Sequence, residues 1–170
     1  MGLTNKLLVD LNDIESRISQ FDINISPTQI SYNVLTVQDM HTRSILGDKL
    51  YFDLLDSYNP QTGVINPPYE DLYDYVVQHL TARVVERSVF NIHFRLTNKG
   101  VQTQNSDYSN ATSDSNVFRY QNVLKRDAEF YEARLWNHLK ENKADYPLFK
   151  EKSDDINPQK PDADFGIFII

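Results

Sequence analysis

The sequence predicts a mainly α-helical protein: a small helical bundle with two long antiparallel helices, a long loop or β-hairpin insertion between them, and an extended C-terminal arm that ends in a strand-like segment. Two long stretches place apolar side chains at helical spacing, a polar stretch separates them, and a charged stretch with two prolines precedes an apolar end. With 170 residues, of which 40% are hydrophobic and 12% aromatic, the chain can bury a modest core. We expect an N-terminal arm or short helix at 1–27, a helical body at 28–148 with an insertion at 98–115, and an extended tail at 149–170.

The first segment allows two structures. Its apolar side chains step at roughly helical spacing, but they also fit a short strand at 7–11 followed by a helix that begins near Asn12 or Asp13. The pattern alone does not choose between them. The next stretch, 22–27, alternates apolar and polar residues and closes with Pro27, so we expect it to be extended.

Two shorter helices should follow, one on each side of Gly47. The first has an apolar stripe on Val34, Val37, His41 and Ile45. Gly47 interrupts this pattern, and Asp48 is well placed to cap a second helix that continues to Tyr58. A turn at 59–63 comes next.

The two long helices are the clearest elements. The first should begin at the prolines Pro67 and Pro68, and about 28 residues would make it about 42 Å long. Its stripe consists of Tyr69, Leu72, Tyr73, Val76, Leu80, Val84, Val85, Val89, Ile92 and Leu96. The stripe of the second consists of Val117, Tyr120, Leu124, Ala128, Tyr131, Leu135 and Leu139. Joined by a long loop, these helices should pack side by side.

Two segments contain too few apolar residues to belong to the hydrophobic core. Residues 98–115 are polar, and a loop of this length is often functional or ordered by a partner. Residues 150–164 are charged and indicate an extended arm. The arm leads into a dense β-forming segment that would aggregate if left unpaired, so we expect it to bind another protein. That segment consists of Phe165, Gly166, Ile167, Phe168, Ile169 and Ile170.

No combination of residues supports catalysis, and we expect no enzyme activity, no metal and no other cofactor. The chain has no cysteine, which excludes thiolate metal sites and cysteine nucleophiles. A small helical metal-binding or enzymatic protein is the alternative, although both long helices lack the Glu-x-x-His motif of di-iron proteins. The candidate side chains for this alternative are His79, His93, Glu129 and Glu132. A run of tyrosines could form a stacking platform, but its spacing favours core and rim positions; the run is Tyr69, Tyr73 and Tyr75.

The charge of the chain argues against nucleic-acid recognition. Its net charge is −7, from 24 acidic and 17 basic residues, whereas nucleic-acid-binding proteins usually carry a basic surplus that neutralises phosphate. No apolar run approaches the roughly 18 residues of a membrane span, and the first residues lack the apolar core of a secretory leader. We therefore expect no membrane partner.

Four short stretches resemble a known family of proteins. They are Ser44 to Tyr51 (SILGDKLY), Ala82-Arg83, Thr97 to Val101 (TNKGV), and Asn142 to Pro147 ahead of the tail. In this order they resemble the head-to-tail connector proteins (adaptor, ring or neck proteins) of tailed bacteriophages, especially those of crAss-like phages, over about residues 28 to 150. The first 27 residues match no motif of that family, and this tail ends in a strand-like segment where some relatives end in a helix.

The resemblance implies a structural virion protein in the neck of the particle, assembled in the host cytoplasm. Such subunits are usually present as a twelve-fold ring under the portal, where they extend the DNA channel toward the tail without binding DNA sequence-specifically. It further implies that the tail segment, Phe165 to Ile170, binds the portal. The loop would contact a neighbouring subunit or a neighbouring neck or tail ring through Asn98, Lys99, Gly100, Val101, Gln102 and Tyr108. A cytosolic regulatory adaptor that docks through its tail is a further alternative.

Overall fold

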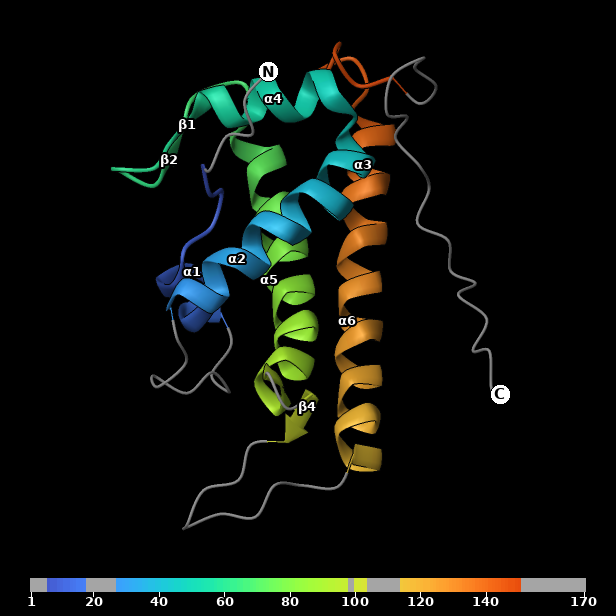
Figure 1. Cartoon of the computed structure of the whole chain (residues 1–170). Coiled ribbons are helices and arrows are strands. Elements are labelled where there is room, and N and C mark those ends of the chain that lie inside the picture. Colours follow the sequence, from blue (N-terminus) through green and yellow to red (C-terminus); the bar gives the residue numbers. More distant parts are fainter. Residues whose placement is uncertain (1–5, 18–26, 98–99, 104–113, 151–170) are drawn as a thin grey trace.

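The computed structural model describes residues 6–17, 27–97, 100–103 and 114–150, and it is mainly α-helical. Two long helices, α5 (Glu70–His93) and α6 (Asp114–Glu141), lie side by side and run in opposite directions (Figure 1). This confirms the predicted fold class, a small helical bundle built on a long antiparallel pair. No helix in the described ranges is both long enough and apolar enough to span a membrane.

Shorter helices cover one side and one end of the long pair. A nearly continuous rod crosses α5 obliquely, and α4 lies across the end where α5 begins (Figure 1). The rod consists of α2 (Pro27–Val37), the π-helical turn η1 (Gln38–Thr42) and α3 (Arg43–Leu46). The remaining helices are α1 (Leu11–Arg17) and α4 (Asp48–Ser57).

The start of α1 decides between the two structures that the first segment allowed. The backbone N–H of Asp10 donates to the Asp13 carboxylate, and the N–H of Asp13 donates to the Asp10 carboxylate, each over 2.9 Å. This reciprocal pairing is a capping box, so Asp10 is the N-cap of a helix that begins at Leu11. Residues 6–10 form no strand. The extended stretch predicted before Pro27 lies outside the described residues.

Gly47 separates α3 from α4, as predicted. Its φ of 76° lies in the left-handed region that glycine enters without steric cost. The predicted cap at Asp48 is wrong, because Gly47 is the N-cap and Asp48 is the first residue of α4. The Asp48 carboxylate instead accepts a hydrogen bond from Arg43 Nε over 2.6 Å, and Arg43 also pairs with Asp39 over 2.9 Å.

The first long helix ends earlier than its apolar stripe predicted. It stops at His93, and the chain continues as β3 (Phe94–Thr97), which pairs antiparallel with β4 (Gly100–Thr103). Leu96 therefore belongs to a strand, opposite Val101. The second long helix also begins earlier than predicted, at Asp114. A second small hairpin pairs β1 (Tyr58–Asn59) with β2 (Val64–Ile65) around the predicted turn.

The core forms where α5 packs against α6 on one side and against α2 on another. The apolar stripe of α5 is buried as predicted at Leu72, Val76, Leu80 and Val84. On α6 the stripe is buried at Val117, Ala128, Leu135 and Leu139. Tyr120 was wrongly placed in that stripe, since 42% of it is exposed, whereas Trp136 is buried although it lies off the stripe.

A buried glutamine on η1 attaches the N-terminal segment to the bundle. Gln38 Oε1 accepts a hydrogen bond from the backbone N–H of Leu8 over 2.7 Å, and Gln38 Nε2 donates to the carbonyl of Lys6 over 3.1 Å. The hydroxyl of Tyr73 on α5 donates to the carbonyl of Leu8 over 2.6 Å. These bonds satisfy backbone groups that have no secondary-structure partner.

Replacing Gln38 with alanine should lower the free energy of unfolding by about 1–3 kcal/mol, because it leaves the buried N–H of Leu8 without an acceptor. Urea unfolding measures the loss, and hydrogen exchange at Leu8 should become faster. The matched control is Gln61→Ala in the exposed β1–β2 turn, which should change stability by less than about 0.5 kcal/mol. Equal effects of the two substitutions would contradict the anchoring role of Gln38.

Candidate functional site

The residues predicted to contact other subunits are only partly described. Gly100, Val101 and Gln102 lie on β4, in a hairpin at the end of the long pair opposite α4 (Figure 1). The register pairs Gln102 with Arg95. Asn98, Lys99 and Tyr108 lie outside the described residues. The predicted contact role of this segment stays a prediction, but the hairpin places it at one tip of the molecule.

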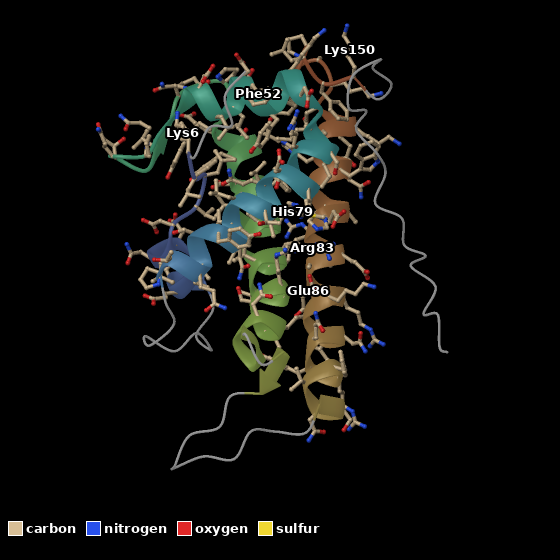
Figure 2. The ribbon with its side chains drawn as sticks, in the orientation of Figure 1. Lys6, Phe52, His79, Arg83, Glu86 and Lys150 are labelled. Atoms are coloured by element: carbon tan, nitrogen blue, oxygen red, sulfur yellow. The ribbon has the colours of Figure 1, made fainter. Side chains whose placement is uncertain are left out.

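The predicted binding segment at 165–170 lies outside the described residues, whereas the point from which the tail starts is well defined. The ring of Phe149 packs edge to face against Trp136 on α6, with 5.8 Å between ring centroids. The N–H of Phe149 donates to the carbonyl of Tyr146 over 2.9 Å. The tail therefore starts at Lys150, beside the last turns of α6 (Figure 2).

The two carboxylates considered as metal ligands each pair with a cation. Glu132 forms a buried ion pair with Arg83 across the interface of α5 and α6. Glu129 lies within 3.8 Å of Lys125 Nζ, one turn away on α6. Across the described ranges, no three His, Cys, Asp or Glu side chains gather as metal ligands would. The side chain of His93 lies outside the described part.

Arg83 is the centre of a buried polar cluster in the middle of the molecule (Figure 2). Only 8% of Arg83 and 8% of Glu132 is exposed, and Arg83 Nη1 also lies 3.6 Å from Glu86 Oε2. A buried guanidinium keeps its charge, so both carboxylates offset the cost of removing it from water. The cluster ties α6 to α5 and fixes their register.

His79 lies one turn before Arg83 and is fully buried. Burial, and then the positive charges of Arg83 and His41, lower its pKa from 6.5 to about 3. Burial, with Arg83 and Arg87, likewise lowers the pKa of His41 on η1 to about 4. Both imidazoles are therefore neutral near pH 7. Neither nitrogen of His79 has a hydrogen-bond partner among the described residues, and a pKa this low suits proton transfer near pH 7 poorly.

The tyrosines considered as a stacking platform pack within the fold instead. Tyr75 stacks on His138 of α6 with 4.1 Å between centroids, and His138 Nε2 is hydrogen-bonded to the hydroxyl of Tyr146 over 2.9 Å. Tyr69 stacks on Tyr146, and Tyr73 stacks on Tyr58. This confirms that the spacing of these tyrosines reflects core and rim positions. The cluster fixes the end of α6 from which the tail starts.

The side of α6 that faces away from α5 combines apolar and cationic side chains. Phe130 is 59% exposed and Val123 is 50% exposed. Arg134 lies at the border of this surface, because its guanidinium carbon is 5.9 Å from the ring centroid of Phe130 and its Nη1 donates to Gln78 Oε1 on α5 over 3.3 Å. We call this surface the outer α6 face, and its exposed residues include Phe118, Arg119, Val123, Arg126 and Phe130. Between 116 and 137, the two arginines of this face, Arg119 and Arg126, stand against one exposed acid, Asp127.

A second surface carries the opposite charge. Exposed carboxylates gather where α4 meets the start of α5, and the hydroxyl of Tyr69 donates to Asp53 and joins the two helices there. We call this surface the acidic end, and it consists of Asp53, Asp56, Glu70, Asp71 and Asp74. In the first turn of α5 such acids are stabilised by the helix dipole. The acidic end therefore carries a surplus of the opposite charge to that of the outer α6 face.

Sequence reasoning missed the outer α6 face. Val123 and Phe130 are seven residues apart, so they lie on one side of a helix, away from the stripe through Leu124 and Ala128. That second apolar line was visible in the sequence. It could have been recognised as an exposed face once one stripe was assigned to the core.

Comparison with known proteins places the chain in a family. A family model with the description "Family of unknown function (DUF6712)" matches residues 42–156. The match covers more than half of the chain, and the chain belongs to this family. It spans α3 to α6 and therefore includes both the Arg83 cluster and the outer α6 face. No curated protein and no solved structure matches the chain.

Proposed function

We propose that this member of the DUF6712 family is a structural virion protein: a head-to-tail connector ring subunit of a tailed bacteriophage that binds the portal and extends the DNA channel toward the tail. The sequence resemblance over residues 28 to 150 motivates the proposal. In this role the protein catalyses no reaction, acts in the neck of the virion, and assembles in the host cytoplasm.

The observation that carries the proposal is the pair of unlike surfaces on one rigid bundle. The outer α6 face is apolar and cationic, whereas the acidic end carries five exposed carboxylates. A closed ring needs two different surfaces on each subunit, because the same heterologous contact repeats around the axis. Opposite charges would orient neighbouring subunits, and the exposed apolar side chains would be buried between them.

The use of the titratable side chains also supports a structural role. Glu132 is paired with Arg83, Glu129 with Lys125, and His138 is held between Tyr75 and Tyr146. Side chains that could carry proton transfer are thus engaged in packing. The net charge of −7 suits a channel wall past which DNA slides, since attraction to phosphate would retard it.

In this proposal the tail binds the portal through 165–170. A β-forming segment added to the edge of a partner's sheet gains main-chain hydrogen bonds, and alternate side chains provide specificity. Several copies in a ring would strengthen attachment through effective concentration. The hairpin at Gly100, Val101 and Gln102 would contact a neighbouring subunit or ring from the other tip.

Deleting 165–170 should abolish binding to the portal and leave the bundle folded, because the Phe149–Trp136 contact that ends the described fold is retained. The experiment mixes purified portal with either chain and measures complex formation and mass by native mass spectrometry. The urea midpoint of the truncated chain should equal that of the full chain. The matched control is Asp162→Asn, which keeps the apolar segment and should keep binding within a few-fold.

Two outcomes would contradict the proposal. Equal portal binding by the truncated chain would remove the tail from the interface. A complex that holds a single copy of the full chain would favour a regulatory adaptor over a ring subunit.

A further inference from the structure

The outer α6 face leaves unusual groups in solvent. Phe118, Val123 and Phe130 are each about half exposed, at 49%, 50% and 59%. Within the described ranges, Arg119 and Arg126 have no ion-pair partner. Apolar side chains beside unpaired cations on one helix face are typical of a binding surface.

The chain carries a segment of complementary chemistry. Residues 151–164 contain five acidic and two basic side chains, and five of the six residues at 165–170 are apolar. The acidic part can pair with the arginines, and the apolar part can cover Val123 and Phe130.

The geometry of the described part lets this segment reach that face in its own chain. The tail starts at Lys150, next to Phe149, whose ring lies against Trp136. Trp136 and Phe130 are six residues apart, about 9 Å along a helix. The fifteen residues from Lys150 to Asp164 can span up to about 50 Å. A tether of this length gives an effective concentration on the order of 1 mM, which favours the tail of the same chain over a second copy in dilute solution.

We propose that in the free subunit residues 151–170 dock on the outer α6 face of the same chain, with the acidic part on Arg119 and Arg126 and the apolar part on Val123 and Phe130. The contact is autoinhibitory, and the part of this inference that names a competing partner rests on the proposed function. The docked tail keeps both the tail itself and the outer α6 face from contacting other proteins until a partner binds the tail. It also shields a β-forming segment from aggregation before assembly.

A spin label tests the docking directly. Because the chain has no cysteine, Ala133→Cys introduces a single labelling site on the outer α6 face, next to Phe130. In dilute full-length protein we expect the label to broaden the backbone amide signals of 165–170 by at least several-fold relative to its reduced form. The control label at Gln61→Cys, in the exposed β1–β2 turn, should leave these signals unchanged.

A mixture of two differently labelled samples shows whether the tail on the outer α6 face comes from the same chain or from a second copy. Spin-labelled chain without isotope is combined with isotope-labelled chain without spin label, and broadening that persists there would assign the face to a second copy and overturn the proposal. No broadening from Ala133→Cys in either sample would overturn it as well. The double variant Arg119→Glu/Arg126→Glu should remove the intramolecular broadening, whereas Lys49→Glu on α4 should not.

The partner experiment separates this inference from the proposed function. If both hold, a single copy of Arg119→Glu/Arg126→Glu should bind the portal several-fold more tightly than a single copy of the natural chain, at a dilution at which no ring forms, because a competing contact is lost. Broadening without any portal binding would refute the function and keep the docking. Portal binding that the double variant leaves unchanged, together with an absence of broadening, would refute the docking and keep the function.

Discussion

Replacing Arg83 with methionine should lower the free energy of unfolding by about 3–5 kcal/mol, because it leaves the buried carboxylate of Glu132 without its partner. Glu86 would lose a cation as well, since it lies 3.6 Å from Arg83. Methionine retains much of the apolar stem of arginine, so the loss reports mainly on charge. Equilibrium unfolding in guanidinium chloride at pH 7 measures it.

A double variant separates the loss of the pair from the loss of packing. Arg83→Met/Glu132→Leu should recover most of the stability, because well-packed apolar residues can replace a buried ion pair at little cost. The surface control is Lys125→Met, which removes the partner of Glu129 on an exposed part of α6 and should cost less than about 1 kcal/mol. If Arg83→Met costs no more than Lys125→Met, water reaches Glu132 and the cluster does not hold α6 on α5.

The long helices could be predicted because their cores are local in sequence. On α6 the steps of three and four residues through Leu135 and Leu139 define one buried line. The same logic worked for α5, where Leu72, Val76, Leu80 and Val84 are buried. The prediction failed at Leu96, because a single apolar residue after a helix fits the period of a helix and that of a strand equally well. The pairing of Leu96 with Val101 depends on a turn that periodicity does not detect.

The polar interior could not be predicted from one apolar stripe. His79 and Arg83 lie seven residues after Leu72 and Val76, on the side of α5 that carries the stripe, but an apolar pattern does not select polar side chains. They are buried because α5 is central: α6 covers one side of it, and α2 and η1 cover another. Sequence reasoning therefore considered His79 and Glu132 as metal ligands, whereas packing and charge pairing explain both. The outer α6 face is the reverse case, since Phe130 is apolar and yet exposed.

Stability should fall steeply below pH 6.5, with His79 as one identifiable cause. Its pKa is lowered from 6.5 to about 3 in the folded state. Between these values the unfolded chain binds a proton at His79 and the folded chain does not. The folded state therefore has the full stability allowed by a neutral His79 above about pH 6.5, and this contribution is lost progressively as the pH falls toward 3. The loss per pH unit is about 1.4 kcal/mol for one such group.

His79→Leu should remove this contribution, because leucine fills a similar space and cannot be protonated. Urea unfolding between pH 6 and pH 4 should show that the free energy of unfolding of the natural chain falls by about 1.4 kcal/mol per pH unit more than that of the variant. Carboxylates titrate in both proteins and cancel in the difference. Leu80→Met, a volume-conserving change at the neighbouring buried position, should keep the full pH dependence. Parallel curves for the natural chain and His79→Leu would mean that the folded protein admits a charged imidazole beside Arg83, and the buried cluster would then have to be open to water or to a counter-ion.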